Sequence, residues 1–193
     1  FHSRSSFTED ISGWDTSAVT GMNQMFNGAN SFNADISGWD VSAVTGMTYM
    51  FNETISFNQD IGGWDVSSVV GVGNMFRGAS SFDQDISDWN VSSFGELMRT
   101  MFNGQNNLSD TNKGKIHASF SSNPNWDYDW SAFVPNTPPT AIDLNGITVA
   151  ENLPVGTIVG EFNATDPDVN ATHVFTLVEG NGSTHNNLFA IDA

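Results

Sequence analysis

The stretch that decides the fold is residues 32–56, FNADISGWDVSAVTGMTYMFNETIS, because the chain repeats it with small changes every 25 residues. A fixed period of roughly 20 to 50 residues indicates stacked units, none of which buries its apolar face alone. Such stacking creates an extended contact surface, so the period favours binding over catalysis. The columns that carry the period are Phe7, Phe32, Phe57 and Phe82; Trp14, Trp39, Trp64 and Trp89; Asp10, Asp35, Asp60 and Asp85; and the pair Met25-Phe26 with its copies at 50–51, 75–76 and, after one inserted residue, 101–102.

Each repeat combines two patterns. Phe32, Ala34 and Ile36 alternate with polar residues, as in a short half-buried strand. Val44 opens a series at helical spacing that continues at positions 47, 50 and 51, and Ser42 is placed to cap it. The sequence therefore predicts an α/β repeat solenoid over residues 1–104. It is leucine-rich-repeat-like, with one short strand and one short helix in each 25-residue coil.

Residues 105–135 break the period and are predicted to form a C-terminal cap, because an open solenoid end exposes apolar surface that a different sequence must close. Ser109 or Asp110 can cap a helix that carries Ile116 and Phe120 on one face. The aromatic residues predicted to form the lid of this cap are Trp126, Trp130 and Phe133.

Residues 136–193 form a third segment, which begins with a proline-rich linker. Three short apolar runs at 147–149, 157–159 and 173–178 are separated by turn residues such as Pro154 and Gly156. This pattern predicts an all-β segment.

Composition excludes several functions. The 193 residues include 22 acidic and 5 basic side chains, a formal net charge of −17, so nucleic acid and anionic lipid are poor partners. The absence of cysteine excludes zinc–thiolate sites and thiol catalysis. No apolar run approaches the roughly 18 residues of a membrane span, so no membrane insertion is expected.

The string that begins at Phe32 and ends at the Met-Phe pair resembles the bacterial surface-protein repeat of the BspA-like leucine-rich-repeat group. The resemblance covers residues 1–104 and implies an exported bacterial protein that is extracellular or held at the cell surface, with a role in adhesion. Phe1 lies 25 residues before Phe26, so the chain is expected to be part of a longer protein.

Residues 138–193 resemble the first half of a cadherin-like domain, and this resemblance implies a partial all-β sandwich. The similar motifs are Glu151-Asn152-Leu153-Pro154, the stretch Asp166-Pro167-Asp168, and the run at 189–192. The resemblance implies calcium as a cofactor, with Glu151, Asp166 and Asp168 as its ligands. The alternative is that Asp166 only closes a local Asx turn.

The acidic columns suggest a recognition surface. The predicted strip, which would suit cationic partners or cation-bridged glycans, consists of Asn33, Asp35, Asn58, Asp60, Asp83 and Asp85. The alternative for the aspartates is that each accepts hydrogen bonds from a neighbouring coil or from Ser and Asn side chains. The second column, Asp15, Asp40, Asp65 and Asn90, is expected to cap the turn after each tryptophan. The Trp column is either a stacking platform for sugars or an internal ladder packed coil on coil.

Catalysis finds no support in the sequence. The four histidines lack ligand spacing, and no nucleophile elbow, zinc-protease motif or phosphate loop is present. The predicted function is a non-enzymatic binding or adhesion module whose partner is a protein or a glycan at a cell surface. The first alternative is an accessory arm of a secreted hydrolase. A more remote alternative is ice binding, which is disfavoured because the threonine residues do not fill one column.

Overall fold

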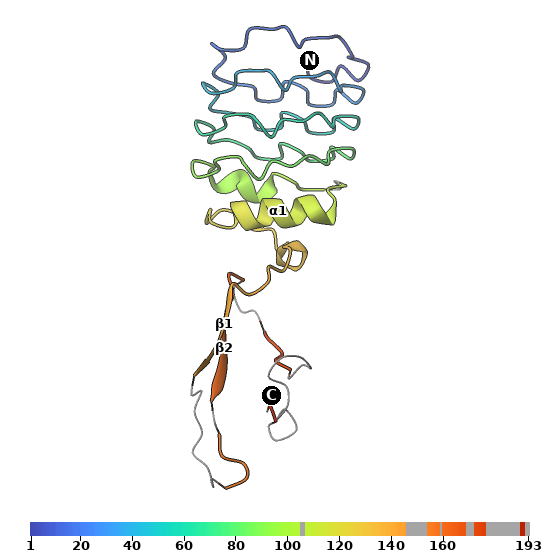
Figure 1. Ribbon diagram of the computed structural model, residues 1–193. Coiled ribbons are helices and arrows are strands. Elements are labelled where there is room, and N and C mark those ends of the chain that lie inside the picture. The colour runs from blue at the N-terminus through green and yellow to red at the C-terminus, as the bar shows by residue number, and fades with distance from the viewer. Residues whose placement is uncertain (105–106, 146–153, 159, 169–171, 177–189, 192–193) are drawn as a thin grey trace. The chain divides into compact units, whose positions relative to one another are not determined.

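The computed structural model describes residues 1–104, 107–145, 154–158, 160–168, 172–176 and 190–191. Its contacts divide the chain into two compact units, Phe1–Pro135 and Asn136–Ala193. Within the described residues, the regular elements are the 3₁₀ helices η1 (Glu96–Thr100) and η2 (Ser131–Phe133), the helix α1 (Asp110–Phe120), and the strands β1 (Ala141–Asn145) and β2 (Glu161–Thr165) (Figure 1).

The predicted α/β solenoid, with one strand and one helix in each coil, is wrong. Residues 1–95, all described, contain turns and isolated parallel bridges such as Gly21 with Gly46, but no helix and no regular strand. The backbone φ angles explain the failure, because Gln24, Tyr49 and Asn74 have φ values of +59°, +57° and +52°. A left-handed residue within the predicted helical stretch of each of the first three repeats interrupts the helix. The turn in which Asp35 accepts the amide of Ser37 ends the predicted strand.

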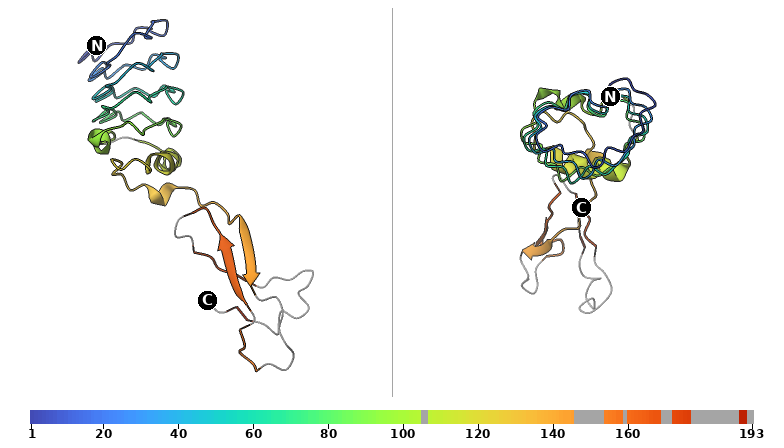
Figure 2. Two further views of the ribbon diagram at one scale, coloured as in Figure 1. Left: turned by 90° about the vertical axis from the view of Figure 1, so that its left-hand side faces the viewer. Right: turned by 90° about the horizontal axis from the view of Figure 1, so that it is seen from above.

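The repeats instead form layers of turns that lie one upon another (Figures 1 and 2). We define the first layer as residues 7–31, the second as 32–56, the third as 57–81 and the fourth as 82–104, and call residues 1–104 the array. The amide of Met22 donates to the carbonyl of Gly46 over 2.8 Å, and Met47 donates to Gly71 over 2.7 Å. Equivalent bonds at alternate residues join the first layer to the second and the second to the third, including Phe26 to Met50 and Phe51 to Met75.

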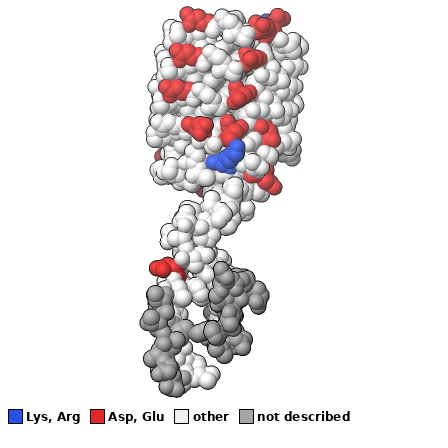
Figure 3. Space-filling view, in the orientation of Figure 1, with Lys and Arg blue, Asp and Glu red and all other residues white. Residues whose placement is uncertain are grey.

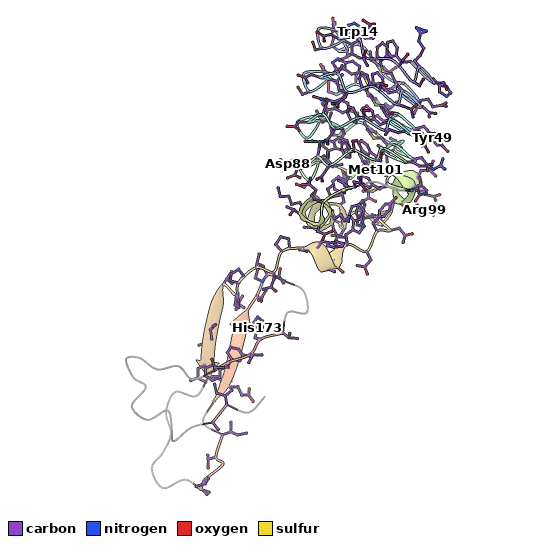
Figure 4. All side chains as sticks on the ribbon, turned by 90° about the vertical axis from the view of Figure 1, so that its right-hand side faces the viewer. Trp14, Tyr49, Asp88, Arg99, Met101 and His173 are labelled. Carbon is purple, nitrogen blue, oxygen red and sulfur yellow. The ribbon has the colours of Figure 1, made fainter. Side chains whose placement is uncertain are left out.

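Columns of aromatic rings fill the interior of the array (Figure 4). Phe51 stacks between Phe26 and Phe76, with ring centroids 5.7 Å apart on each side. Each buried tryptophan also donates its indole N–H to a carbonyl of the preceding layer, as Trp64 does to Ile36 over 3.2 Å. The interpretation of the Trp column as an internal ladder is thereby confirmed for Trp39, Trp64 and Trp89.

The helix predicted after the array is confirmed as α1. Ser109 is its N-cap, with a side chain that accepts from the amide of Asn112, and Ile116 and Phe120 are buried. Gly114 is needed where it stands, because a Cβ there would lie 2.0 Å from the carbonyl oxygen of Phe133.

The segment after α1 satisfies backbone groups at the end of the array. The side-chain amide of Asn123 donates to the backbone carbonyls of Val91 and Phe94, over 2.6 and 3.3 Å. The hydroxyl of Tyr128 accepts from the amide of Phe102 over 2.9 Å. The partly buried aromatic residues Trp126, Tyr128 and Trp130 lie against Phe102.

The second unit contains an antiparallel pair, β1 with β2, in which Ala141 pairs with Thr165 and Asn145 with Glu161. The predicted partial sandwich is wrong, because the described residues contain no second sheet. Of the expected strands, 147–149 lies outside the described residues. Thr157 closes a turn on Pro154 instead of entering a strand. Ile142 is 64% exposed, so this pair buries little apolar surface.

Candidate recognition surface

The first acidic row consists of carboxylates held in the same way in each layer. Each accepts, through Oδ1, the backbone N–H two residues later, over 2.9 to 3.0 Å, which is the geometry of an Asx turn. Because the turn recurs with the sequence, acidic side chains recur from layer to layer on one face of the array (Figure 3). The members of this row are Asp10, Asp35, Asp60 and Asp85.

The second row caps the turn after each tryptophan, as predicted. Asp40 accepts from the amide of Ser42 over 3.0 Å and from its hydroxyl over 2.6 Å, and Asn90 makes the same pair of bonds with Ser92. An asparagine therefore supports this turn as well as an aspartate does. The members of this row are Asp15, Asp40, Asp65 and Asn90.

The turn hydrogen bonds stabilise the ionised form of carboxylates in both rows. The amide of Ser37, followed by its hydroxyl, lowers the pKa of Asp35, and the hydroxyl of Ser42, followed by its amide, lowers the pKa of Asp40. The charges of Asp15 and Asp65 act in the opposite direction on the pKa of Asp40. Carboxylates of neighbouring layers are thus close enough to repel one another, and the hydrogen bonds outweigh that repulsion.

The amide half of the predicted strip joins layers together. Asn33 accepts, through Oδ1, the amide of Asn58 over 2.9 Å, and Asn58 in turn accepts the amide of Asp83 over 2.8 Å. Asp83 ends this ladder by accepting the amide of Ser109 over 2.8 Å. These three side chains are used in holding the layers in register.

The last two acids of the strip bind α1. Asp83 also accepts from the hydroxyl of Ser109 over 2.9 Å and from the side-chain amide (Nδ2) of Asn112 over 2.8 Å. Burial raises the pKa of Asp83, but the hydrogen bonds from Ser109 and Asn112 outweigh it and the net shift is downward. Asp85 forms an ion pair with Lys115, Oδ2 to Nζ, at 2.7 Å.

The predicted strip therefore divides into carboxylates that face solvent and side chains that hold the structure. The exposed acids whose Oδ2 accepts no hydrogen bond from any described residue are Asp10, Asp15, Asp35, Asp40, Asp60 and Asp65. The sequence predicted turn capping only for the second row. The available signal for the same role in the first row was a small residue two positions after each aspartate, which is serine in three layers and Gly62 in the third.

The predicted calcium ligands are only partly described, since Glu151 lies outside the described residues. Asp166 accepts the amide of Asp168 through Oδ1 over 2.8 Å, and its Oδ2 lies 2.8 Å from Nε2 of His173. The hydrogen bond from His173 lowers the pKa of Asp166. The alternative Asx turn is thus present, and His173 is a partner that the sequence did not single out.

Asp168 is also engaged, because its Oδ2 accepts the amide of Thr137 over 2.7 Å. Within the described part of the chain, no three His, Asp or Glu side chains are grouped so that they could hold a metal ion. Asp166 and Asp168 are engaged by His173 and Thr137, and the calcium site stays a prediction that depends on Glu151. No helix among the described residues is long and apolar enough to cross a membrane.

Comparison with known proteins identifies one family. The family model described as "Mycoplasma protein of unknown function, DUF285" matches residues 1–114, which contain the array, η1 and the start of α1. Neither the curated proteins nor the solved structures include a match. The match supports the predicted repeat family in its coarse form, while the BspA-like and cadherin-like assignments remain predictions.

Proposed function

Since the chain belongs to the DUF285 family, which matches 1–114 of its 193 residues, we propose that it is a non-enzymatic binding module of an exported bacterial protein. In this proposal the module lies outside the cell or at its surface. Its exposed acidic rows bind a partner that presents basic groups at repeated positions, most simply a basic segment of another protein.

The observation that carries the proposal is the repetition of one carboxylate geometry. The aspartates at 35 and 60, and those at 40 and 65, occupy equivalent turns of consecutive layers, and each leaves one oxygen free of described hydrogen bonds. An exposed carboxylate forms only a weak ion pair by itself. Several carboxylates at fixed spacing can act together on one partner, which supports a repetitive ligand over a compact one.

Charge supports the same partner chemistry. The chain carries a formal net charge of −17, and the turns lower the pKa of Asp15, Asp35, Asp40 and Asp65, which favours their ionised forms. A surface of one sign attracts basic partners at long range, and salt screens that attraction. Binding is therefore expected to weaken as the salt concentration rises.

The test uses a short oligolysine peptide as the probe and isothermal titration as the measurement. The variant carries Asp35→Asn, Asp40→Asn and Asp65→Asn. Asn90 shows that asparagine keeps the turn of the second row, and the first-row turn of Asp35 uses the same acceptor, Oδ1. The matched control removes three exposed acids outside the rows, through Asp88→Asn, Glu96→Gln and Asp127→Asn.

We expect the row variant to bind the peptide more weakly than the control, and we expect added salt to reduce this difference. Equal weakening of the two variants would contradict the proposal, because the peptide would then respond only to net charge. Unchanged binding by the row variant would contradict it as well.

A further inference from the structure

A groove of about 390 Å³ lies between the fourth layer and the end of α1. One wall is the turn that follows Trp89 and includes Asn90 and Ser92, and the other is formed by Ser119, Ser122 and the residues after α1. A volume of this size is within the range of small-molecule sites, about 300–1,000 Å³. The groove shares no residue with the exposed carboxylates of the two acidic rows.

Both walls of the groove are held by hydrogen bonds. Asn90 Oδ1 accepts from the amide and the hydroxyl of Ser92, over 3.2 and 2.8 Å. Asn123 is 5% exposed and connects the walls, because its amide donates to the carbonyl of Val91 over 2.6 Å. The hydroxyl of Ser122 donates to the carbonyl of Ser119 over 3.2 Å. The groove is therefore formed before any ligand enters.

The groove is uncharged on a strongly acidic protein. Asn90 occupies the place that an aspartate holds in the three preceding layers, and the turn does not require the change, because both residues make the same bonds. The neighbouring end of α1 carries partial negative charge from its carbonyl groups. A carboxylate at position 90 would create a site for cations there, and the amide of Asn90 removes that preference.

The hydrogen-bonding groups left over in the groove suit hydroxyl groups. Nδ2 of Asn90 and the hydroxyl of Ser119 make no hydrogen bond with any described residue. The ring of Trp89 is 3% exposed and its indole N–H is used on the carbonyl of Ile61, over 3.0 Å, so the exposed apolar part of the lining is Pro124. A ligand that both donates and accepts, and that carries no charge, matches this lining.

We propose that this groove binds a neutral sugar unit of a glycan. Sugar hydroxyls would accept from Asn90 Nδ2 and donate to the hydroxyl oxygen of Ser119, while a C–H face of the sugar ring would lie towards Pro124. This site uses none of the exposed carboxylates of the acidic rows, so its binding should not depend on the salt concentration.

The test is saturation-transfer NMR on the whole chain with the methyl glycosides of glucose, galactose, mannose and N-acetylglucosamine. Glucosamine and glucuronate serve as the cationic and anionic comparisons. The variant Asn90→Asp keeps the turn, removes the amide donor and adds a charge. Ser119→Ala removes the second group, and Asp65→Asn is the control in the same column outside the groove. Thermal melting confirms that each variant is folded.

At least one neutral glycoside is expected to bind, with an affinity about tenfold lower in Asn90→Asp, as the loss of one hydrogen bond implies. Ser119→Ala should also weaken binding, and Asp65→Asn should not change it. The absence of transfer to every neutral glycoside would overturn the proposal. Binding that survives both groove variants, or a preference for glucosamine, would overturn it too.

Discussion

The array and the segment that follows it satisfy their backbone in opposite ways. In the array a hydrogen bond has a copy 25 residues later, as the bond from Met22 to Gly46 has in the bond from Met47 to Gly71. In residues 107–135 the contacts with the array are made once, by side chains such as Asn123 and Tyr128. A periodic sequence can add layers, but each added layer again leaves backbone groups without hydrogen-bond partners at the end of the array. Its last layer needs polar side chains placed by an aperiodic sequence.

The same contrast divides the acidic rows. Asp35 and Asp60 lie inside the array, where the free oxygen of each carboxylate accepts no described hydrogen bond. Asp85 has the same turn, but Lys115 of α1 binds its second oxygen. In our proposal the first acidic row therefore binds a partner through Asp35 and Asp60, while its last member, Asp85, holds α1 against the array.

The largest effect is expected from the periodic interior. Trp64 is 4% exposed and donates to Ile36, so Trp64→Ala should lower the free energy of unfolding by about 3–5 kcal/mol, since it leaves a cavity and an unpaired carbonyl. Trp14, at 48% exposed, is the matched control, and its change to Ala should cost far less. Chemical denaturation measures both, and equal losses would contradict the ladder as the main source of stability.

The second prediction concerns the aperiodic end. Asp83→Ala should cost about 1–3 kcal/mol, because it leaves donors of Ser109 and Asn112 without their acceptor. Loosening of α1 should follow and can be measured by hydrogen exchange of its amides. Asp85→Asn, which breaks one exposed ion pair, is the milder control. An Asp83→Ala protein with α1 as protected as in the original chain would show that other contacts dock this helix.

Asp83 also predicts a pH dependence. Burial raises the pKa of Asp83, but the hydrogen bonds from Ser109 and Asn112 lower it by more than burial raises it. The pKa of Asp83 in the folded protein therefore lies below the ordinary value of 3.8. A lowered carboxyl pKa contributes stability that is complete above the unfolded pKa and is lost as the pH falls through the folded one. The original chain should therefore lose more stability than Asp83→Asn in this acidic range. Parallel loss in the two proteins, measured by denaturation at several pH values, would argue against this role.

The smallest expected effect is an increase in the stability of the array. The Asn52 amide donates to Asn27 over 2.8 Å, but Asn52 Oδ1, in a residue 7% exposed, has no partner. Arg77 occupies the next place of this column. Arg77→Asn should continue the ladder and raise the free energy of unfolding by about 1 kcal/mol. Arg77→Ala is the control that should not, and equal melting of the two variants would show that no new bond forms.

From the sequence, the buried core residues could be predicted more successfully than the conformation of the backbone. The columns of Phe and Trp identified buried positions, and Ser109 with Ile116 and Phe120 identified α1. The strand and helix in each coil were wrong because apolar spacing does not report φ. Tyr49 is left-handed at +57°, where its type gives no signal.

The candidate site could be predicted only in part for a similar reason. Periodicity placed Asp35 and Asp60 in one column, but it gave Asp83 and Asp85 the same role. Their partners, Ser109 and Lys115, lie in the aperiodic segment, 26 and 30 residues away from them. Contacts of this kind depend on how the segment folds back, which a repeat pattern does not encode.

The central claim is that the acidic rows of the array, with their carboxylates fixed by turns, form the recognition surface. The most direct test follows backbone amide signals by NMR while the oligolysine peptide is added. The account predicts shifts at the amides that hold the free carboxylates, those of Ser37, Ser42, Gly62 and Ser67, and much smaller shifts at Ser87, whose partner Asp85 is bound to Lys115. Shifts spread evenly over all acidic positions, or concentrated at Ser87 and α1, would contradict it.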